Sequence, residues 1–412
     1  MDIAMRLPLA LAGVLLASGA HAAPITYAAA LDLAETASPT LQARALQVDG
    51  ARAAARAAGA LPDPRLGVGI DNFPVSGPPA GRFNGDSMTM ARIGIAQDIP
   101  NGAKRDAARA RAQSDITAAG AARLASRRDV RTAAAVSWLN LYYAEQRLSA
   151  VDAVLSRLEP LWASAPSAVA SGAVRPGQSL EAEQMRADLQ DRRSEILATV
   201  GRGRAELARW TGDPAAEVAG TPPAFEVDPV GLRAAVAQHP RLAEGDAATA
   251  QAEADVRMAR AEKRPDWSWE LTYQRRDPMF GDMVSAGATI SLPLFAGRRQ
   301  DPLIAAKVAA AGQARAEREA TRRELAAQLD AALADHNMHH EQWGRAATVL
   351  VPLAQKRADL ETASYGAGRA DLAAVLQAFT ALANAQLTRL DREAAVAVDA
   401  ANLVLTYGSD QP

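Results

Sequence analysis

The stretch of sequence that decides the fold is DWSWELTYQRRDPMFGDMVSAGATISLPL, residues 266–294. Apolar and polar residues alternate in it, beginning with Trp267 and Trp269, and the alternation resumes after the polar loop RRDPMFGD. A period of two is typical of β-strands. The segment therefore predicts a hairpin with strands at about 266–275 and 283–294, each with one apolar and one polar face.

A second hairpin pattern lies in the first part of the chain. Residues 66–70 alternate leucine, valine and isoleucine with glycine, and Ile93 and Ile95 belong to a similar alternation. These patterns predict strands at about 65–73 and 88–99. The segment between them is rich in proline and glycine, which is typical of a loop without core residues.

The two hairpins belong to a tandem duplication. Pro39 recurs as Pro240, 201 residues later, and each half has the same order: two helices, a hairpin, a long helix, a glycine-rich reversal and a returning helix. The repeats cover about 27–213 and 228–408. This period is far longer than that of solenoid repeats. We therefore expect residues 23–412 to form one protomer.

Long helical tracts are expected at about 104–165 and 302–362. Sixty helical residues extend about 90 Å, which is too long for a globular helix. The tracts end at the reversals SGAVRPGQS (171–179) and YGAGRAD (365–371). In the second tract, residues three or four apart predict a coiled-coil-like seam: Leu325, Leu329, Ala332, His336, His340, Trp343, Ala347 and Leu350.

The first residues indicate export. Arg6 precedes a short apolar run, and Ala20-His21-Ala22 is a small-x-small cleavage site. The run is too short for a transmembrane helix, so we expect residues 1–22 to be a cleaved signal peptide, with an uncleaved anchor as the alternative. The chain has no cysteine, so neither a disulfide nor a lipid anchor at the cleavage site is expected.

Composition narrows the class of protein. Aromatic residues make up only 4% of the chain, while alanine and charged residues dominate. This composition favours elongated helices over compact globules, and the fold class is expected to be mainly α with a small β part. A net charge of −2 gives no reason to expect a nucleic acid partner.

Strands of about ten residues with a period of two match those of outer-membrane barrels. An ordinary half-buried periplasmic sheet shows the same alternation and stays open as an alternative. Because four strands cannot close a barrel, several copies would have to pool their strands. In that arrangement, three aromatic residues would lie at the lipid interface: Trp267, Trp269 and Tyr273.

The whole mature chain resembles the TolC-type outer-membrane efflux proteins, also called outer-membrane factors. The resemblance is carried by the duplicated order of elements and by the segments IAQDIPNGAKR (95–105), ISLPLFAGRR (290–299) and YGAGRADLAAVLQA (365–378). It implies a homotrimer whose protomers each give four strands to a twelve-stranded barrel in the outer-membrane lipid. The barrel would continue as an α-helical tunnel across the periplasm.

The resemblance also implies partners, namely a periplasmic adaptor (membrane fusion) protein and an inner-membrane pump of the RND type. The glycine reversals would dock the adaptor, although any helical hairpin needs such turn residues. The docking residues would be Gly172, Val174, Arg175, Pro176, Gly177, Ser179, Gly366, Gly368, Arg369 and Asp371.

Two departures from the family pattern concern anchoring and gating. Many relatives carry a lipidated cysteine at the mature N-terminus, which this chain lacks. Relatives can also narrow the tunnel mouth with carboxylates just past the second reversal, where this chain has Ala374 and Gln377. The nearby charge candidates for the tunnel mouth are Glu181, Glu183 and Asp371, although solvated helix-face charges are the competing interpretation.

The segment HNMHHE, residues 336–341, is the one titratable cluster that stands out. His336 and His340 share a helix face and could chelate a divalent metal. Their counterparts in the first repeat are Tyr142 and Gln146, which favours a packing role, so we expect no metal site and keep the pair as weak candidates. No HExxH, GxSxG or phosphate-binding loop is present, so neither a cofactor nor a catalytic residue is expected.

The sequence thus predicts the outer-membrane exit duct of a tripartite efflux system, and not an enzyme. The segments LPDPRLGVGIDNFPVSGP (61–78) and MTMARIGIAQDIPNGAKR (88–105) resemble the heavy-metal-efflux branch, which favours cations such as copper or silver as cargo. The alternatives are a duct for organic toxins or for type I protein secretion, a soluble periplasmic coiled-coil scaffold, and a periplasmic metal-binding protein or enzyme.

Overall fold

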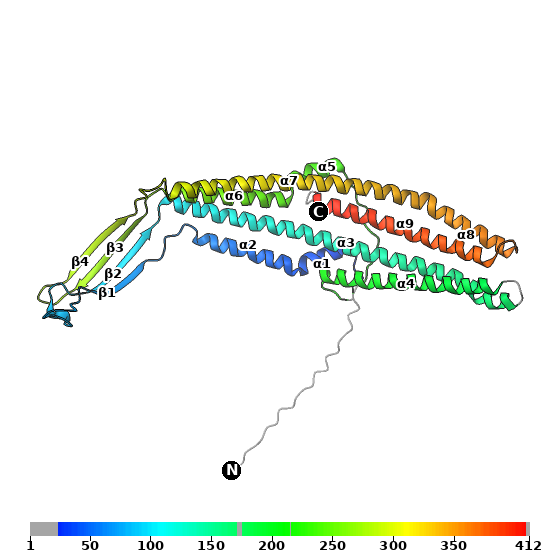
Figure 1. The fold of residues 1–412 in the computed structure, drawn as a ribbon, viewed down its shortest axis with the longest axis horizontal. Helices are drawn as coiled ribbons and strands as arrows, with labels where there is room; N and C mark the ends of the chain where they lie inside the picture. Colours follow the sequence, from blue (N-terminus) through cyan, green and yellow to red (C-terminus); the bar gives the residue numbers. More distant parts are fainter. Residues whose placement is uncertain (1–23, 171–174, 215, 409–412) are drawn as a thin grey trace, which may run out of the picture.

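The computed structural model describes residues 24–170, 175–214 and 216–408. The expected signal peptide, residues 1–22, lies outside this part. The described chain is elongated, with a four-stranded sheet at one end and two helix reversals at the other (Figure 1). No described helix is both long enough and apolar enough to cross a bilayer.

Helices make up most of the protomer, as expected for a mainly α chain with a small β part. Short 3₁₀ turns occur at Phe83–Gly85 and Val236–Gln238, and a π-helical turn occurs at Ala346–Leu350. The strands are β1 (Arg65–Asp71), β2 (Met90–Ile99), β3 (Trp267–Arg275) and β4 (Met283–Ile290). The helices are α1 (Tyr27–Ala37), α2 (Pro39–Ala57), α3 (Gly102–Ala170), α4 (Pro176–Thr211), α5 (Pro229–Ala235), α6 (Pro240–Ala261), α7 (Gln300–Arg345), α8 (Val351–Gly366) and α9 (Leu372–Tyr407).

The start of the second helix is built in the same way in both halves. The Ser38 hydroxyl accepts a hydrogen bond from the backbone N–H of Leu41, and Pro39 occupies the first turn. In the second half, the Nδ1 atom of His239 accepts from the N–H of Arg241, next to Pro240. A side-chain cap followed by proline is a strong helix start, because proline has no N–H to leave unpaired.

The helices form a layer whose order follows that of the strands. The sheet order is β1-β2-β3-β4, and the helices that leave its end pack in the order α2-α3-α6-α7 (Figure 1). Toward the other end, α3 packs against α4 and α9, and α9 packs against α8. The layer therefore has one edge made by β1, α2 and α4 and another made by β4, α7 and α8.

The sheet is antiparallel throughout and joins both repeats. β2 of the first hairpin pairs with β3 of the second, with Ile93 opposite Tyr273 and Ile95 opposite Leu271. Within the described residues, β1 and β4 are each paired on one side only. Both outer strand edges of the protomer therefore carry unpaired backbone groups.

The core lies between the helices, near the middle of the molecule. Trp138 of α3 is fully buried, and its indole N–H donates to the carbonyl oxygen of Ile25 at 2.8 Å. Its ring stacks on Tyr142 with the centroids 5.4 Å apart. A further cluster, which includes Leu158 and Leu376, holds the far ends of the helices together. The middle and the far end of the helical body thus each have their own apolar packing.

Strand β4 is shorter than expected. It ends at Ile290 and not near residue 294, because Pro293 has no N–H for a ladder hydrogen bond. The N–H of Leu294 instead bonds to the carbonyl oxygen of Leu292 at 2.9 Å, which turns the chain toward α7.

The predicted seam of the second long helix is only partly correct. Leu329 is buried, but the next buried residue is Leu333, one position past the expected alanine, and His340 and Leu350 are exposed. An α-helix repeats every 3.6 residues and drifts away from a strict heptad. The π-helical turn Ala346–Leu350, just before Pro352, contains one extra residue per turn, which shifts the helix face on which the last two seam residues, Ala347 and Leu350, lie.

Candidate functional site

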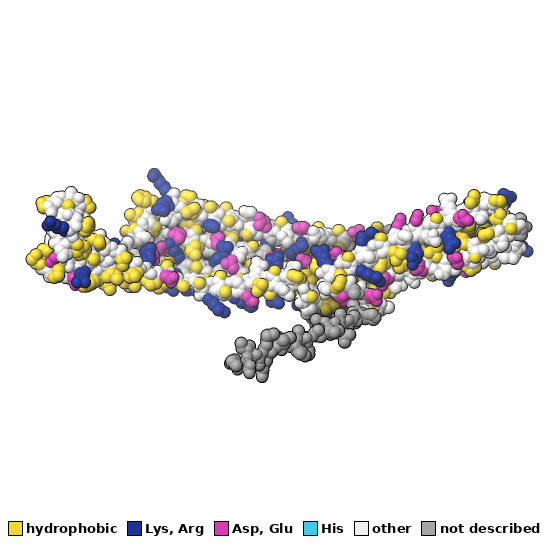
Figure 2. All heavy atoms as spheres, turned by 90° about the horizontal axis from the view of Figure 1, so that it is seen from below, with side chains coloured by type: hydrophobic (Ala, Val, Ile, Leu, Met, Phe, Trp, Pro, Cys, Tyr) yellow, Lys and Arg dark blue, Asp and Glu magenta, His cyan; other side chains and the backbone are white. Residues whose placement is uncertain are grey.

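The sheet exposes a continuous apolar face. Directly opposed residues of antiparallel strands lie on the same face, so the register places Val68, Ile93, Tyr273 and Val284 in one row across all four strands. Each of the four is 43% exposed or more. Hydrophobic side chains gather at this end of the molecule (Figure 2). A water-soluble sheet would normally cover such a face.

The predicted interface aromatics lie on this face. Trp267 is 50% exposed, Trp269 is 41% exposed and Tyr273 is 43% exposed. The two tryptophans occupy the end of β3 next to the helices, whereas Tyr273 lies toward the hairpin loop. The aromatic side chains thus mark both ends of the apolar face.

The opposite face of the sheet is polar, and its charges are paired across β1 and β2. Arg65 Nη2 lies 2.8 Å from Asp98 Oδ1, and Arg92 Nε lies 3.5 Å from Asp71 Oδ2. On β3, the Thr272 hydroxyl donates to Glu270 Oε1 at 3.2 Å. A sheet with one apolar and one polar face separates two different surroundings.

Glycine lets β2 and β3 approach closely on the polar face. A Cβ atom on Gly94 would lie 2.8 Å from the Thr272 hydroxyl oxygen and 3.2 Å from the Leu271 carbonyl oxygen. Thr272 is buried as a result, at 4% exposure, although the strand around it is open. Any larger residue at position 94 would push apart the two strands that join the repeats.

A polar network fixes the sheet to the helices. Asn101, at the start of α3, donates from its backbone N–H to Asp266 Oδ1 at 2.8 Å and from its side-chain amide to the Ala261 carbonyl oxygen at 3.1 Å. Lys104 binds Asp266 and also Glu262, the latter at 2.9 Å. The network joins the exit of the first hairpin to the entry of the second. Asn101 and Asp266 are 165 residues apart, so no local sequence pattern predicts this network.

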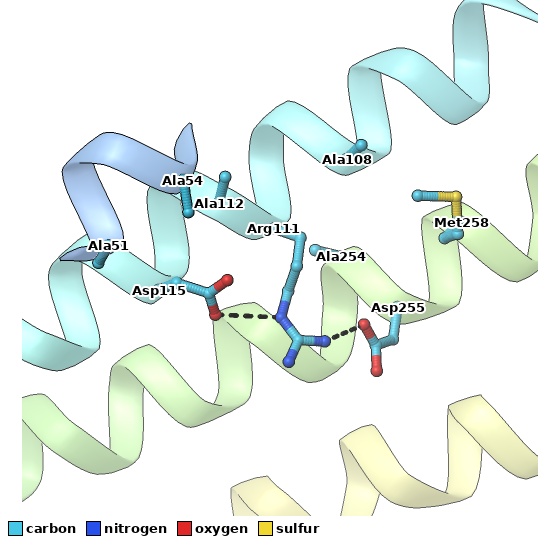
Figure 3. A pocket seen from close by; sticks show the side chains of 9 residues that line it. All are labelled: Ala51, Ala54, Ala108, Arg111, Ala112, Asp115, Ala254, Asp255 and Met258. Carbon is cyan, nitrogen blue, oxygen red and sulfur yellow. Dashed lines mark hydrogen bonds and ion pairs between the residues drawn. The ribbon is translucent and has the colours of Figure 1, made fainter. Parts of the chain in front are cut away.

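Below the network, an open hollow of about 350 Å³ lies between α2, α3 and α6 (Figure 3). Most of the residues that line it are alanines. Arg111 of α3 donates to Asp115 of the same helix at 3.2 Å and to Asp255 of α6. Asp255 also accepts from Lys307 of α7 at 3.1 Å. Partial burial alone would raise the carboxyl pKa of Asp255, but the two cations outweigh burial and hold this pKa below its ordinary value.

At the other end, Gln178 brings the two reversals together. Its amide N–H donates to Asp371 Oδ2 at 3.1 Å, and its amide oxygen accepts from the Arg175 N–H at 3.1 Å. Asp371 also caps α9 by accepting from the Ala374 N–H at 2.8 Å. Gln178 was not among the predicted site residues, because the contact joins positions 193 residues apart.

The second reversal is a compact glycine turn. Gly368 has φ +71°, a conformation that favours glycine, and its N–H bonds to the Tyr365 carbonyl oxygen at 2.9 Å. Of the predicted docking residues, Gly172 and Val174 lie outside the described residues. The others lie at this end, where Ser179 is half-buried and the rest are exposed: Arg175, Pro176, Gly177, Gly366, Gly368, Arg369 and Asp371.

The predicted tunnel-mouth charges occupy two kinds of position. Glu181 and Glu183 are exposed on the first turns of α4, and Glu181 lines a hollow of about 420 Å³ between α4 and α9. Asp371 is engaged by Gln178 and by the start of α9. The structure thus brings Asp371 into a link between reversals, while Glu181 and Glu183 face solvent in the protomer.

The histidine cluster lies on α7 facing α9. His339 Nδ1 lies 2.7 Å from Asp399 Oδ2, and the rings of His336 and His340 have centroids 6.3 Å apart. In the described part of the chain, no group of three or more histidine, cysteine or acidic residues is placed to enclose a metal ion.

Comparisons with known proteins agree with this architecture. Residues 231–409 match the family model described as outer membrane efflux protein. No curated protein sequence matches the chain.

Solved structures with the same fold cover nearly the whole chain. One is CusC, in a study of its folding and transmembrane channel formation, with 17% identity, a TM-score of 0.79 and coverage of 93% of this chain and 92% of that one. Another is the outer membrane protein VceC from Vibrio cholerae (21%, 0.76, 93% and 96%). A third is the outer membrane channel CmeC from Campylobacter jejuni (14%, 0.78, 98% and 94%). At these identities the structures show a shared fold.

Proposed function

We propose that the chain is an outer-membrane channel of the outer membrane efflux protein type, not an enzyme, and that it is the exit duct of a tripartite efflux system. The match of residues 231–409 to that family model and the fold shared with CusC and CmeC support this proposal. It would passively export heavy-metal cations, handed over by an inner-membrane RND-type pump and a periplasmic adaptor. The observation that carries the proposal is an exposed apolar sheet face bounded by two unpaired strand edges.

The two edges of the protomer support a closed ring of copies. The edge of β4, α7 and α8 exposes Leu303, Leu353 and Leu360, and the edge of β1, α2 and α4 exposes Leu46 and Leu180. A ring that pairs β4 of one copy with β1 of the next would satisfy both strand edges and cover these leucines. Three copies with four strands each would give the twelve-stranded barrel that the family resemblance implies.

The two faces of the sheet support a membrane position for this ring. In lipid, the apolar face would point outward, and the polar face with Glu270 and the Arg65–Asp98 pair would line the passage. Trp267 and Trp269 would lie at the periplasmic interface, where amphipathic rings are favoured, because they adjoin the helical end of β3. The helices would then continue into the periplasm.

The far end of the molecule is the proposed adaptor-docking surface. It is exposed, it is formed by both reversals, and Gln178 holds the reversals in one unit. Glu181 and Glu183 add negative charge beside it. The proposed contact residues are Gly172, Val174, Arg175, Pro176, Gly177, Ser179, Gly366, Gly368, Arg369 and Asp371.

The choice of cargo rests on the resemblance of residues 61–78 and 88–105 to the heavy-metal branch. The fold does not discriminate between cargoes, because structures as different in sequence as CusC, VceC and CmeC share it. The first experiment compares growth of a strain lacking the gene, with and without the gene restored, across copper, silver, zinc, cobalt and several organic toxins. We expect selective metal sensitivity that the gene rescues.

Sensitivity restricted to organic toxins would overturn the cargo assignment and keep the duct.

Docking is tested with Arg369→Ala at the second reversal and Arg323→Ala, an exposed arginine of α7, as its matched control. We expect the tip variant alone to lose resistance at equal amounts in the outer membrane. Equal resistance in both variants would remove Arg369 from the docking surface.

A further inference from the structure

Three of the five histidines of the chain lie within one turn of α7, at positions 336, 339 and 340. Neither the sheet nor the reversals use them. His340 is exposed, whereas His336 is half-buried at the contact with α9. An exposed histidine four residues after a half-buried one places two imidazole rings side by side on one helix face.

The ring positions are close to those of a bidentate chelate. The centroids of His336 and His340 are 6.3 Å apart, with the ring planes inclined by 51°. Two imidazoles that share an ion at metal–nitrogen distances of about 2.0–2.1 Å have centroids roughly 5 Å apart. The proposed chelate therefore requires the exposed His340 ring to move toward His336.

His336 has an unexplained polar atom. Its Nδ1 is buried and has no hydrogen-bond partner among the described residues. His336 is half-buried at this position, so little solvent is available to satisfy the atom. Buried ring nitrogens are normally satisfied by protein, water or an ion.

The surroundings favour a cation over an anion. Asp399 of α9 is held by His339 at 2.7 Å, and its carboxylate also acts electrostatically on His336. A fixed carboxylate beside imidazole rings lowers the energy of a positive ion bound between them. His339 itself is occupied on its Nδ1 side, which leaves His336 and His340 as the two ligands.

We propose that His336 and His340 form an open, two-ligand site for a late first-row divalent cation, with Cu²⁺ bound most tightly. Imidazole ligands suit Cu²⁺, Ni²⁺ and Zn²⁺, and affinities for such sites rise to Cu²⁺ and fall again at Zn²⁺. Because the protein supplies only two ligands, water or ligands that accompany the ion complete its coordination. The bound ion therefore exchanges readily with ions in solution. The site adds a metal-binding step to the proposed function. It rests on that function only for the identity of the exported ion.

The protein carries a built-in reporter for this site. The ring of Trp343 lies 5.6 Å from that of His340. Cu²⁺ quenches nearby indole fluorescence, so titration of the purified full-length protein in detergent with Cu²⁺ is expected to quench Trp343 saturably. The Trp343→Phe variant should lose the quenched component while calorimetry still detects one bound ion per chain.

The matched variants separate ligands from neighbours. His340→Ala, at an exposed position, and the double variant His336→Ala plus His340→Ala are expected to weaken Cu²⁺ binding at least tenfold, whereas His339→Ala should retain it. Unchanged affinity in the double variant would overturn the site. Cu²⁺ binding by the purified protein does not depend on export. If the site exists but the protein exports organic toxins, the double variant still loses Cu²⁺ affinity. If the protein exports metals but lacks the site, the double variant keeps its Cu²⁺ affinity.

Discussion

The helical body buries its large apolar residues, whereas the sheet exposes them on one face. In the body, Trp138 and Leu329 are fully buried between helices, and the outer surfaces carry ion pairs such as Arg318–Asp246. In the sheet, Val68 is 73% exposed and Trp267 is 50% exposed, and the paired charges lie on the other face. This difference is what the proposed function requires, with the helical body in water and the apolar face of the sheet in lipid.

The largest expected effect tests the interior of the body. Trp138→Ala removes a fully buried indole and one of the two hydrogen bonds that the Ile25 carbonyl oxygen accepts, the other coming from the Ala219 N–H. We expect the free energy of unfolding to fall by about 3–5 kcal/mol, as is usual for large core truncations. Denaturant unfolding followed by circular dichroism measures the loss. The control is Trp210→Ala, a half-buried tryptophan, for which we expect less than half the effect; equal losses would contradict a core at Trp138.

The next prediction tests directly whether the apolar face of the sheet contacts lipid or water. Leu271→Arg places a charge in the middle of the apolar face, where a lipid-facing position costs about 2–4 kcal/mol. We expect less of the variant in the outer membrane and a lower melting temperature of the assembled protein. Val230→Arg on exposed α5 is the matched control, with an expected change within about 0.5 kcal/mol. If both variants behaved alike, the sheet face would be facing water.

The smallest expected effect concerns the ion pairs of the body. Asp255 has a carboxyl pKa held below its ordinary value by Arg111 and Lys307, so its charged form stabilises the fold. We expect Asp255→Asn to cost about 1 kcal/mol at pH 7, as partly exposed pairs do. A lowered acid pKa contributes stability above the unfolded value near 3.9 and loses it as the pH falls through the folded value.

The gap between wild type and Asp255→Asn should therefore shrink below about pH 3.9, in unfolding measurements made stepwise from pH 7 to pH 2. A gap that stayed constant over this range would show that the carboxylate charge contributes nothing.

Periodicity made much of this architecture predictable. The period-two stretch at 266–275 predicts β3 almost residue for residue, because alternation is sharp and the flanking Pro265 stops the preceding helix. The glycine reversals were equally visible, since Gly368 needs a positive φ. By contrast, the turn at Ala346–Leu350 depends on how a proline disturbs a long helix, and no periodic pattern encodes it.

The contacts that join the repeats could not be predicted. Asn101 meets Asp266 across 165 residues, and Gln178 meets Asp371 across 193. These pairs form only when two complete hairpins lie side by side, so the local sequence carries no signal for them. The duplication does predict that the two hairpins are equivalent units, but it does not predict which of their polar residues pair.

The single-sided pairing of β1 and β4 sets a requirement on the biogenesis of the protein. In the proposed ring, a protomer that has not yet joined its neighbours carries two strand edges that can pair with any extended chain they meet, next to an uncovered apolar face. Its helices have their own core, but under this proposal the sheet is complete only after copies have joined. Assembly and insertion of the sheet would then be one event, and cells that make the protein would have to keep free protomers apart until it happens.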